Sequence, residues 1–167
     1  KRGLDTIGAS LDRLIKKDKM SAADKAAAMA RISTATSTSA LADCDLVIEA
    51  ATENVDLKLR IFAELDSVVK PEAILASNTS SISITRLAAG TKRPSQVIGM
   101  HFFNPVPVMA LVELINGLQT SAATYAAVEE LAKSIGKSPI KVKNSPGFVV
   151  NRMLCPMINE AVFVLGE

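Results

Sequence analysis

Four polar side chains of the 167-residue chain stand where they could support acid–base chemistry: Ser80, His101, Glu113 and Asn151. His101 is the only histidine, it ends an apolar segment, and two phenylalanines follow it. Because the unperturbed pKa of imidazole lies near neutrality, His101 is a natural general base. Glu113 lies in a second apolar segment, where an ionised carboxylate is costly unless it is paired. A polarised or cationic imidazole would be such a partner, so the sequence predicts a His101–Glu113 pair.

Each of these residues also has an ordinary structural interpretation. A lone histidine is often a hydrogen-bonded residue of the core. Ser80 belongs to a polar stretch directly after an apolar run, at the carboxyl end of a predicted strand where ligands bind in open α/β sheets. It could instead form a turn or cap the next helix, as Ser81 or Ser83 could. Asn151 falls in a predicted helix, where asparagine is usually exposed or bonded to the backbone.

Apolar runs of strand length alternate with helix-periodic segments along the chain, a pattern typical of an α/β fold with a mostly parallel sheet. The predicted strands cover residues 46–50, 73–77, 97–101, 111–115 and 139–142, with a possible short strand at 32–36. The predicted helices cover residues 4–14, 22–31, 55–69, 82–89 and 122–134. In this arrangement Ser80 and His101 are expected at the same end of the sheet.

A last helix is predicted from Ser145 and Pro146, because a serine cap followed by proline at the first helical position is a common helix start. Pro156 should kink this helix, since it lacks a backbone N–H. The helix is apolar on more than one face and should therefore pack against several partners.

Composition narrows the possible functions. The net charge is +2 and 49% of the residues are hydrophobic, so a nucleic-acid-binding surface is not indicated. The cluster Lys16, Lys17 and Lys19 is interpreted as a solvated helix end, with contact to a phosphate-bearing ligand as the alternative. Cys44 and Cys155 lack metal-ligand spacing and are expected to be buried thiols. No run is long enough to cross a membrane, so a cytoplasmic protein is expected.

Four sequence blocks together resemble the 3-hydroxyacyl-CoA dehydrogenase family, and within it the bacterial 3-hydroxybutyryl-CoA dehydrogenases. The blocks are ASNTSS at residues 76–81, GMHFFNPVPVM at 99–109, LVELI at 111–115 and NSPGFVVNR at 144–152. The resemblance extends over nearly the whole chain. It implies a partial Rossmann-type sheet with flanking helices, followed by the first helix of an α-helical C-terminal domain.

The resemblance also implies roles for the polar residues. His101 would take the proton of the 3-hydroxyl group, and Glu113 would hold the ring and stabilise the imidazolium. Ser80 and Asn151 would hydrogen-bond the substrate oxygen or carbonyl, while Asn104 would help to place the nicotinamide. The reaction implied is oxidation of a (3S)-3-hydroxyacyl-CoA to the 3-oxoacyl-CoA with NAD, in a homodimer.

Glu53 and Lys58, in the segment ATENVDLK, match family positions that contact NAD. Ser80 and Asn104 complete the cofactor-binding set that the resemblance implies. Alternatively, the negative charge of Glu53 merely interacts favourably with the dipole at a helix N-terminus, and Lys58 is an ordinary solvated helix residue.

The chain departs from the family pattern at both ends. It contains no GxGxxG turn, and the family continues further into a helical domain. Residues 1–144 are expected to form an NAD-binding domain without its first strands, and residues 145–167 the start of the helical domain. A missing strand would pair beside residues 46–49, so the 167 residues alone are expected to aggregate, to bind no NAD and to be inactive. A non-catalytic acyl-CoA-binding relative, or the dehydrogenase part of a multifunctional fatty-oxidation protein, remain the alternatives.

Overall fold

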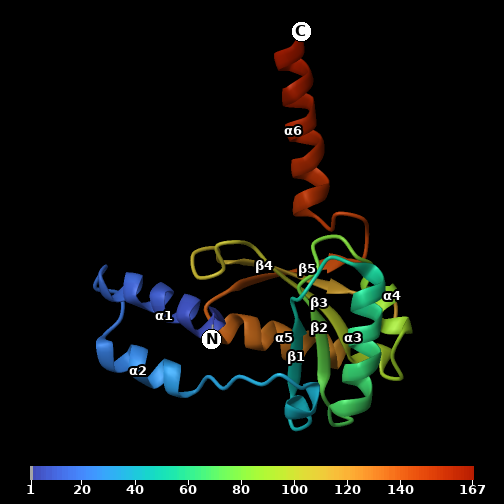
Figure 1. Ribbon diagram of the computed structural model, residues 1–167. Helices are drawn as coiled ribbons and strands as arrows, with labels where there is room; N and C mark the ends of the chain where they lie inside the picture. Colours follow the sequence, from blue (N-terminus) through green and yellow to red (C-terminus); the bar gives the residue numbers. More distant parts are fainter. Residues whose placement is uncertain (1) are drawn as a thin grey trace. The chain divides into compact units, whose positions relative to one another are not determined.

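The computed structural model describes residues 2–167, and the chain divides into two compact units between Ser37 and Thr38. The first unit contains two helices, α1 (Arg2–Ile15) and α2 (Ala22–Ala30). The second contains a five-stranded sheet, its covering helices and the last helix (Figure 1). The predicted division at residues 144 and 145 stays a prediction.

The first unit is an α-helical pair. Ser21 caps α2, since its hydroxyl accepts from the Asp24 N–H at 3.0 Å and the Asp24 carboxylate accepts from the Ser21 N–H at 3.3 Å. The Ser21 hydroxyl also donates to the Asp24 carboxylate at 2.7 Å, and this bond together with that from the Ser21 N–H holds the pKa of Asp24 below its usual value. The short strand predicted at 32–36 is wrong: these residues are exposed and irregular, because within residues 2–167 no strand pairs with them.

The sheet of the second unit runs in the order β1-β2-β3-β4-β5. Its strands are β1 (Leu46–Glu49), β2 (Ile74–Ser77), β3 (Val97–Phe102), β4 (Leu111–Asn116) and β5 (Ser138–Lys143). The pairs β1–β2, β2–β3 and β4–β5 are parallel, while β3–β4 is antiparallel. The predicted mostly parallel sheet is therefore confirmed. Because β2 and β3 are parallel, their carboxyl ends bring Ser80 and His101 to one end of the sheet, as predicted.

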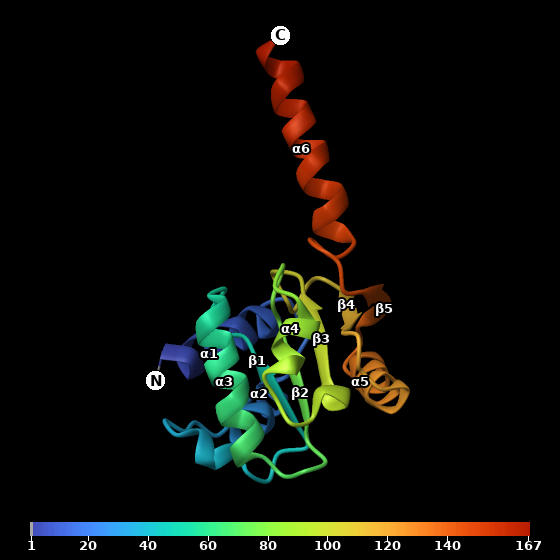
Figure 2. The same ribbon diagram turned by 90° about the vertical axis from the view of Figure 1, so that its right-hand side faces the viewer.

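Helices cover both faces of this sheet (Figure 2). On one face α3 (Val55–Val68) and α4 (Ile84–Ala89) contribute Phe62, Leu65, Ile84 and Leu87 to a buried cluster that also contains Leu75, Val97 and Ile115. On the other face α5 (Ala122–Ser134) packs Val128 and Ala132 against Ile98, Met100 and Leu114. Two 3₁₀ turns, Thr38–Leu41 and Pro94–Gln96, complete the connections. The strands are therefore apolar on both faces, as the runs in the sequence predicted.

β1 forms one edge of the described sheet, and Ile48 on it is 40% exposed. The expected neighbouring strand beside residues 46–49 stays a prediction. No helix in residues 2–167 is both long enough and apolar enough to span a bilayer.

The last helix, α6 (Val150–Gly166), begins four residues later than Pro146, so the predicted start is wrong. Gly147 and Phe148 have φ angles of 73° and 52°, which a right-handed helix cannot contain. This turn buries the Phe148 ring, which is 1% exposed, in the apolar cluster beneath α4. The burial of a large aromatic ring therefore outweighs the local preference of the Ser-Pro pair.

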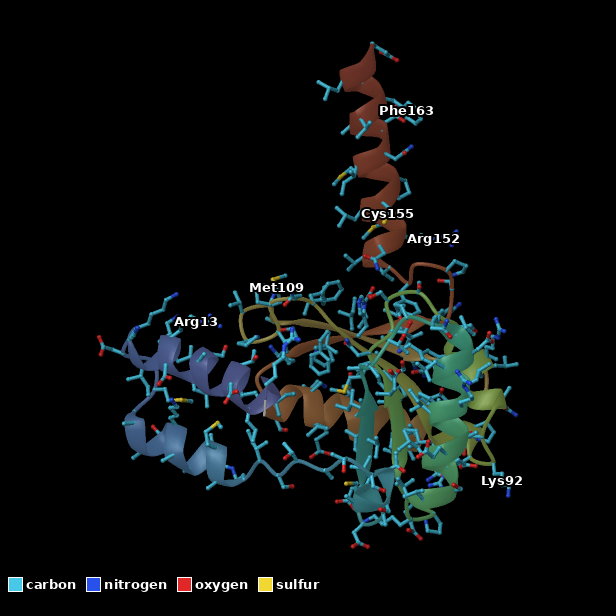
Figure 3. All side chains as sticks on the ribbon, viewed as in Figure 1. Arg13, Lys92, Met109, Arg152, Cys155 and Phe163 are labelled. Carbon is cyan, nitrogen blue, oxygen red and sulfur yellow. The ribbon has the colours of Figure 1, made fainter. Side chains whose placement is uncertain are left out.

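Helix α6 continues through Pro156, and its side chains from Arg152 onward are exposed (Figure 3). The predicted kink at Pro156 stays a prediction. The expectation of buried thiols is wrong: Cys155 is exposed on α6 and Cys44 is half-buried. Cys155 is exposed because it shares the unpacked surface of this helix.

Candidate active site

Two adjacent strands place His101 and Glu113 side by side. The residues are direct partners in the antiparallel register of β3 and β4, so their side chains share one face of the sheet. His101 Nδ1 lies 2.8 Å from Glu113 Oε2, and the two residues are 5% and 0% exposed. The contact predicted from the sequence is therefore present.

The second oxygen of Glu113 is also engaged. Oε1 accepts the backbone N–H groups of Val149 and Val150, each at 3.0 Å. These are among the first N–H groups of α6, which has no side-chain cap of its own. One buried carboxylate thus orients the imidazole and accepts hydrogen bonds from the first backbone N–H groups of α6.

The hydrogen bonds of Glu113 select one tautomer of His101. An ionised carboxylate only accepts hydrogen bonds, so the proton lies on Nδ1 and donates to Oε2. The lone pair of Nε2 is then available to a proton from another molecule. The rings of Phe103 and Phe148 flank the imidazole, with centroids 4.6 and 5.8 Å away, and limit access of water to it.

The loop between β2 and α4 brings Ser80 to the same end of the sheet. The Asn78 side-chain oxygen accepts the Phe102 N–H at 2.8 Å, which ties this loop to the end of β3. Asn151 on α6 donates from Nδ2 to the Ser80 carbonyl at 3.3 Å. The structure thus brings Asn151 to Ser80, and the start of α6 to Glu113.

Glu53 and Lys58 line a pocket of about 240 Å³ next to this loop. The pocket is lined by Ala50, Ala51, Thr52, Glu53, Lys58, Asn78 and Ser80. Lys58 is 1% exposed, so its interpretation as an ordinary solvated residue is wrong. The Glu53 side chain is 46% exposed, and its Oε1 accepts the Ser80 N–H at 2.6 Å and the Thr79 hydroxyl at 2.8 Å.

Asn104 does not line this pocket. It is exposed in the segment that follows β3. The structure therefore brings together three of the four residues expected to bind the cofactor, Glu53, Lys58 and Ser80.

The sequence interpretation missed Glu49, which ends β1 and is 5% exposed. Its carboxylate accepts from Lys58 Nζ, from the Ser77 hydroxyl at 2.9 Å and from the Ala51 N–H at 2.7 Å. Burial opposes ionisation of Glu49, but these hydrogen bonds outweigh it and hold the pKa below its usual value. A signal existed, because Glu49, like Glu113, is an acid within an apolar strand.

The pocket residues fit part of a dinucleotide. The pocket lies beyond the carboxyl ends of the parallel strands β1 and β2, the place where open α/β sheets bind nucleotides. The half-exposed carboxylate of Glu53 is an acceptor suited to ribose hydroxyls, and the small residues Ala50 and Ala51 leave room for close approach.

The fold and the buried acid–base pair define a Rossmann-type α/β domain of the dehydrogenase class. The profile of the family described as "3-hydroxyacyl-CoA dehydrogenase, NAD binding domain" matches residues 1–145. The chain belongs to this family, whose cofactor is NAD, as the sequence blocks implied.

Individual relatives agree with this assignment. The chain is 52% identical over 167 residues to a 3-hydroxybutyryl-CoA dehydrogenase of Bradyrhizobium diazoefficiens, covering 100% of the chain and 57% of the relative. It is 44% identical over 166 residues to a 3-hydroxyadipyl-CoA dehydrogenase of Escherichia coli, covering 99% of the chain and 35% of that protein.

Among solved structures, the (S)-3-hydroxybutyryl-CoA dehydrogenase of Ralstonia eutropha is 66% identical, with a TM-score of 0.97 over 99% of the chain and 58% of that structure. The chain thus spans little more than half the length of the 3-hydroxybutyryl-CoA dehydrogenases that it matches.

Proposed function

We propose that the full-length protein oxidises (3S)-3-hydroxyacyl-CoA thioesters to 3-oxoacyl-CoA thioesters, reversibly and with NAD. The observation that carries this proposal is the buried His101–Glu113 pair at the end of the sheet, next to a polar pocket. Family membership supplies the reaction class. The pair supplies the base that the reaction needs.

In this proposal His101 Nε2 accepts the proton of the substrate 3-hydroxyl group. Glu113 fixes the tautomer that leaves Nε2 free and stabilises the imidazolium that forms, because its carboxylate lies 2.8 Å from Nδ1. Bound NAD supplies the acceptor for the hydride. Phe103 and Phe148 keep the imidazole in an apolar surrounding, where the charge of Glu113 acts strongly.

Ser80 and Asn151 are proposed to hydrogen-bond the substrate oxygen or carbonyl. Their side chains belong to two segments that the 3.3 Å contact between Asn151 Nδ2 and the Ser80 carbonyl already holds together. Glu53, Lys58 and Ser80 are proposed to contact the cofactor in the pocket, with Asn104 reaching the nicotinamide from the loop after β3.

The acyl substrate and the assembly are parts of the same proposal. The relatives named above act on hydroxybutyryl- and hydroxyadipyl-CoA, so a short-chain 3-hydroxyacyl-CoA is the proposed substrate. A homodimer is proposed, and the cytoplasmic location stays a prediction. A 44% match over 154 residues to the fatty acid oxidation complex subunit alpha of Acinetobacter baylyi keeps a multifunctional protein as the alternative context.

The test is a direct assay of the full-length protein. Incubation of (3S)-3-hydroxybutyryl-CoA with NAD should produce NADH in proportion to 3-oxoacyl-CoA, and the (3R) enantiomer should serve as the matched control without activity. A protein that bound acyl-CoA in a calorimeter but formed no NADH from any (3S)-3-hydroxyacyl-CoA would contradict the proposal. That result would support the non-catalytic alternative.

A further inference from the structure

A chain of buried polar contacts connects β1, α3 and the Ser80 loop. At its centre is Lys58, whose ammonium group lies between two carboxylates. Nζ donates to Glu49 Oε2, lies 3.6 Å from Glu53 Oε2, and is 3.4 Å from the Ser77 hydroxyl. Glu49 and Lys58 are nearly inaccessible, whereas the Glu53 side chain is 46% exposed to the pocket.

The two carboxylates hold the same loop from two sides. Glu49 Oε2 accepts the Ser77 hydroxyl at 2.9 Å, and the Ser77 oxygen in turn accepts the Thr79 N–H at 3.3 Å. Glu53 Oε1 accepts the Thr79 hydroxyl and the Ser80 N–H directly. The position of Ser80 therefore depends on both acids.

A buried ion pair adds little net stability to a fold, because the cost of removing two charges from water offsets most of their attraction. In other proteins an apolar pair of similar volume often replaces a buried ion pair without loss of stability. Such a pair would leave Glu53 and the Ser80 loop without their anchors. Lys58 lines the pocket and Glu49 holds it from the buried side, so the pair is better explained by the residues that it orients.

We propose that Glu49 is a positioning residue of the cofactor site. It draws the Lys58 ammonium group to the inner side of the pocket, so that Glu53 is free to bind Ser80 and the cofactor. Without the charge of Glu49, Lys58 would have Glu53 as its remaining carboxylate, because Nζ is already 3.6 Å from it. Movement of Lys58 toward Glu53 would then pull Glu53 away from the Ser80 N–H. This inference rests on the proposed function, because it assumes that NAD occupies the pocket.

The test is Glu49→Gln in the full-length protein, which keeps the shape of the side chain and removes its charge. The KM for NAD and the Kd for NADH should each rise about tenfold to a hundredfold, the change expected when one hydrogen bond to a charged group is lost. The KM for the acyl-CoA should change less. Glu49→Asp keeps the charge and should recover part of the affinity for NADH.

The matched control is Asp45→Asn, at the other end of β1. Asp45 also pairs with a lysine, Lys70, at 2.5 Å, but its side chain is 92% exposed and lies outside the pocket lining. The Kd of the Asp45→Asn protein for NADH should equal that of the unmodified protein. If Glu49→Gln fails to fold, Ser77→Ala removes the link between Glu49 and Thr79 and should also raise the Kd for NADH.

A folded Glu49→Gln protein that melts at a lower temperature but binds NADH within twofold of the unmodified protein would overturn the inference. Glu49 would then have a structural role alone. This outcome is distinct from failure of the proposed function, in which the unmodified protein itself would neither bind NADH nor oxidise the thioester.

Discussion

Replacing Glu113 by glutamine should abolish most of the turnover without unfolding the protein. The glutamine oxygen can accept the N–H groups of Val149 and Val150, which the structure places 3.0 Å from Glu113 Oε1. Its NH₂ group must then face His101 Nδ1, which becomes an acceptor. The imidazole proton would move to Nε2, and the nitrogen that should take the substrate proton would already carry one.

The opposite orientation of the amide would set its NH₂ group against two backbone N–H donors, and so it is disfavoured. A wrong tautomer at a catalytic histidine lowers turnover by roughly a thousandfold to ten-thousandfold. The start of α6 keeps its acceptor, so the melting temperature should change little. Glu113→Ala, by contrast, leaves buried donors unpaired and should cost about 1–3 kcal/mol for each unpaired group.

The assay is NADH formation from a short (3S)-3-hydroxyacyl-CoA, with melting followed by circular dichroism. The matched control is Glu130→Gln, the same substitution at an exposed position of α5. Retention of more than about a tenth of the turnover by Glu113→Gln, with unchanged folding, would refute the tautomer argument, which predicts a far larger loss.

Three further predictions concern stability. Because the pKa of Glu49 is lowered in the folded protein, its ionised form stabilises the fold above the ordinary carboxyl pKa of about 4.3, and this contribution should be lost as the pH falls through the lower folded value. The free energy of unfolding, measured by chemical denaturation at several pH values, should therefore depend less steeply on pH in Glu49→Gln than in the unmodified protein. Arg93→Met should cost about 3–5 kcal/mol, measured by urea unfolding, because Arg93 Nε lies 2.6 Å from a largely buried Asp66; an equal stability would contradict it. Gly99→Ala should cost about 1–3 kcal/mol, since its Cβ would lie 2.8 Å from Ile115 Cβ, and an unchanged melting temperature would disprove this clash.

The strands and most helices were predictable because their apolar residues recur with the period of the element they form. The runs at 46–50 and 97–101 correspond to β1 and β3 within one residue at each end. The His101–Glu113 pair was predictable for a different reason. A carboxylate in an apolar strand needs a partner, and the chain offers one histidine.

Other features depend on contacts that no local pattern contains. The start of α6 is set by burial of Phe148 and by the hydrogen bonds that its first N–H groups donate to Glu113, and these contacts outweigh the Ser145-Pro146 signal. The run at 32–36 has β-branched residues but no neighbouring strand, and propensity alone does not make a strand. Lys58 can be buried because it pairs with Glu49, and this contact forms only when α3 packs beside β1. The antiparallel β4 did have a signal, because the link at 103–110 is too short for a parallel crossover.

The central claim is that His101 is the base and that Glu113 acts through it. The most direct measurement is a double-mutant cycle on turnover in the full-length protein, using His101→Gln, Glu113→Gln and the pair together. His101→Gln should lower turnover by roughly a hundredfold to ten-thousandfold. The double variant should be scarcely worse than His101→Gln alone, because residues that act as a unit are not additive. Two defects that multiplied as independent effects would contradict the claim and leave Glu113 with a structural role.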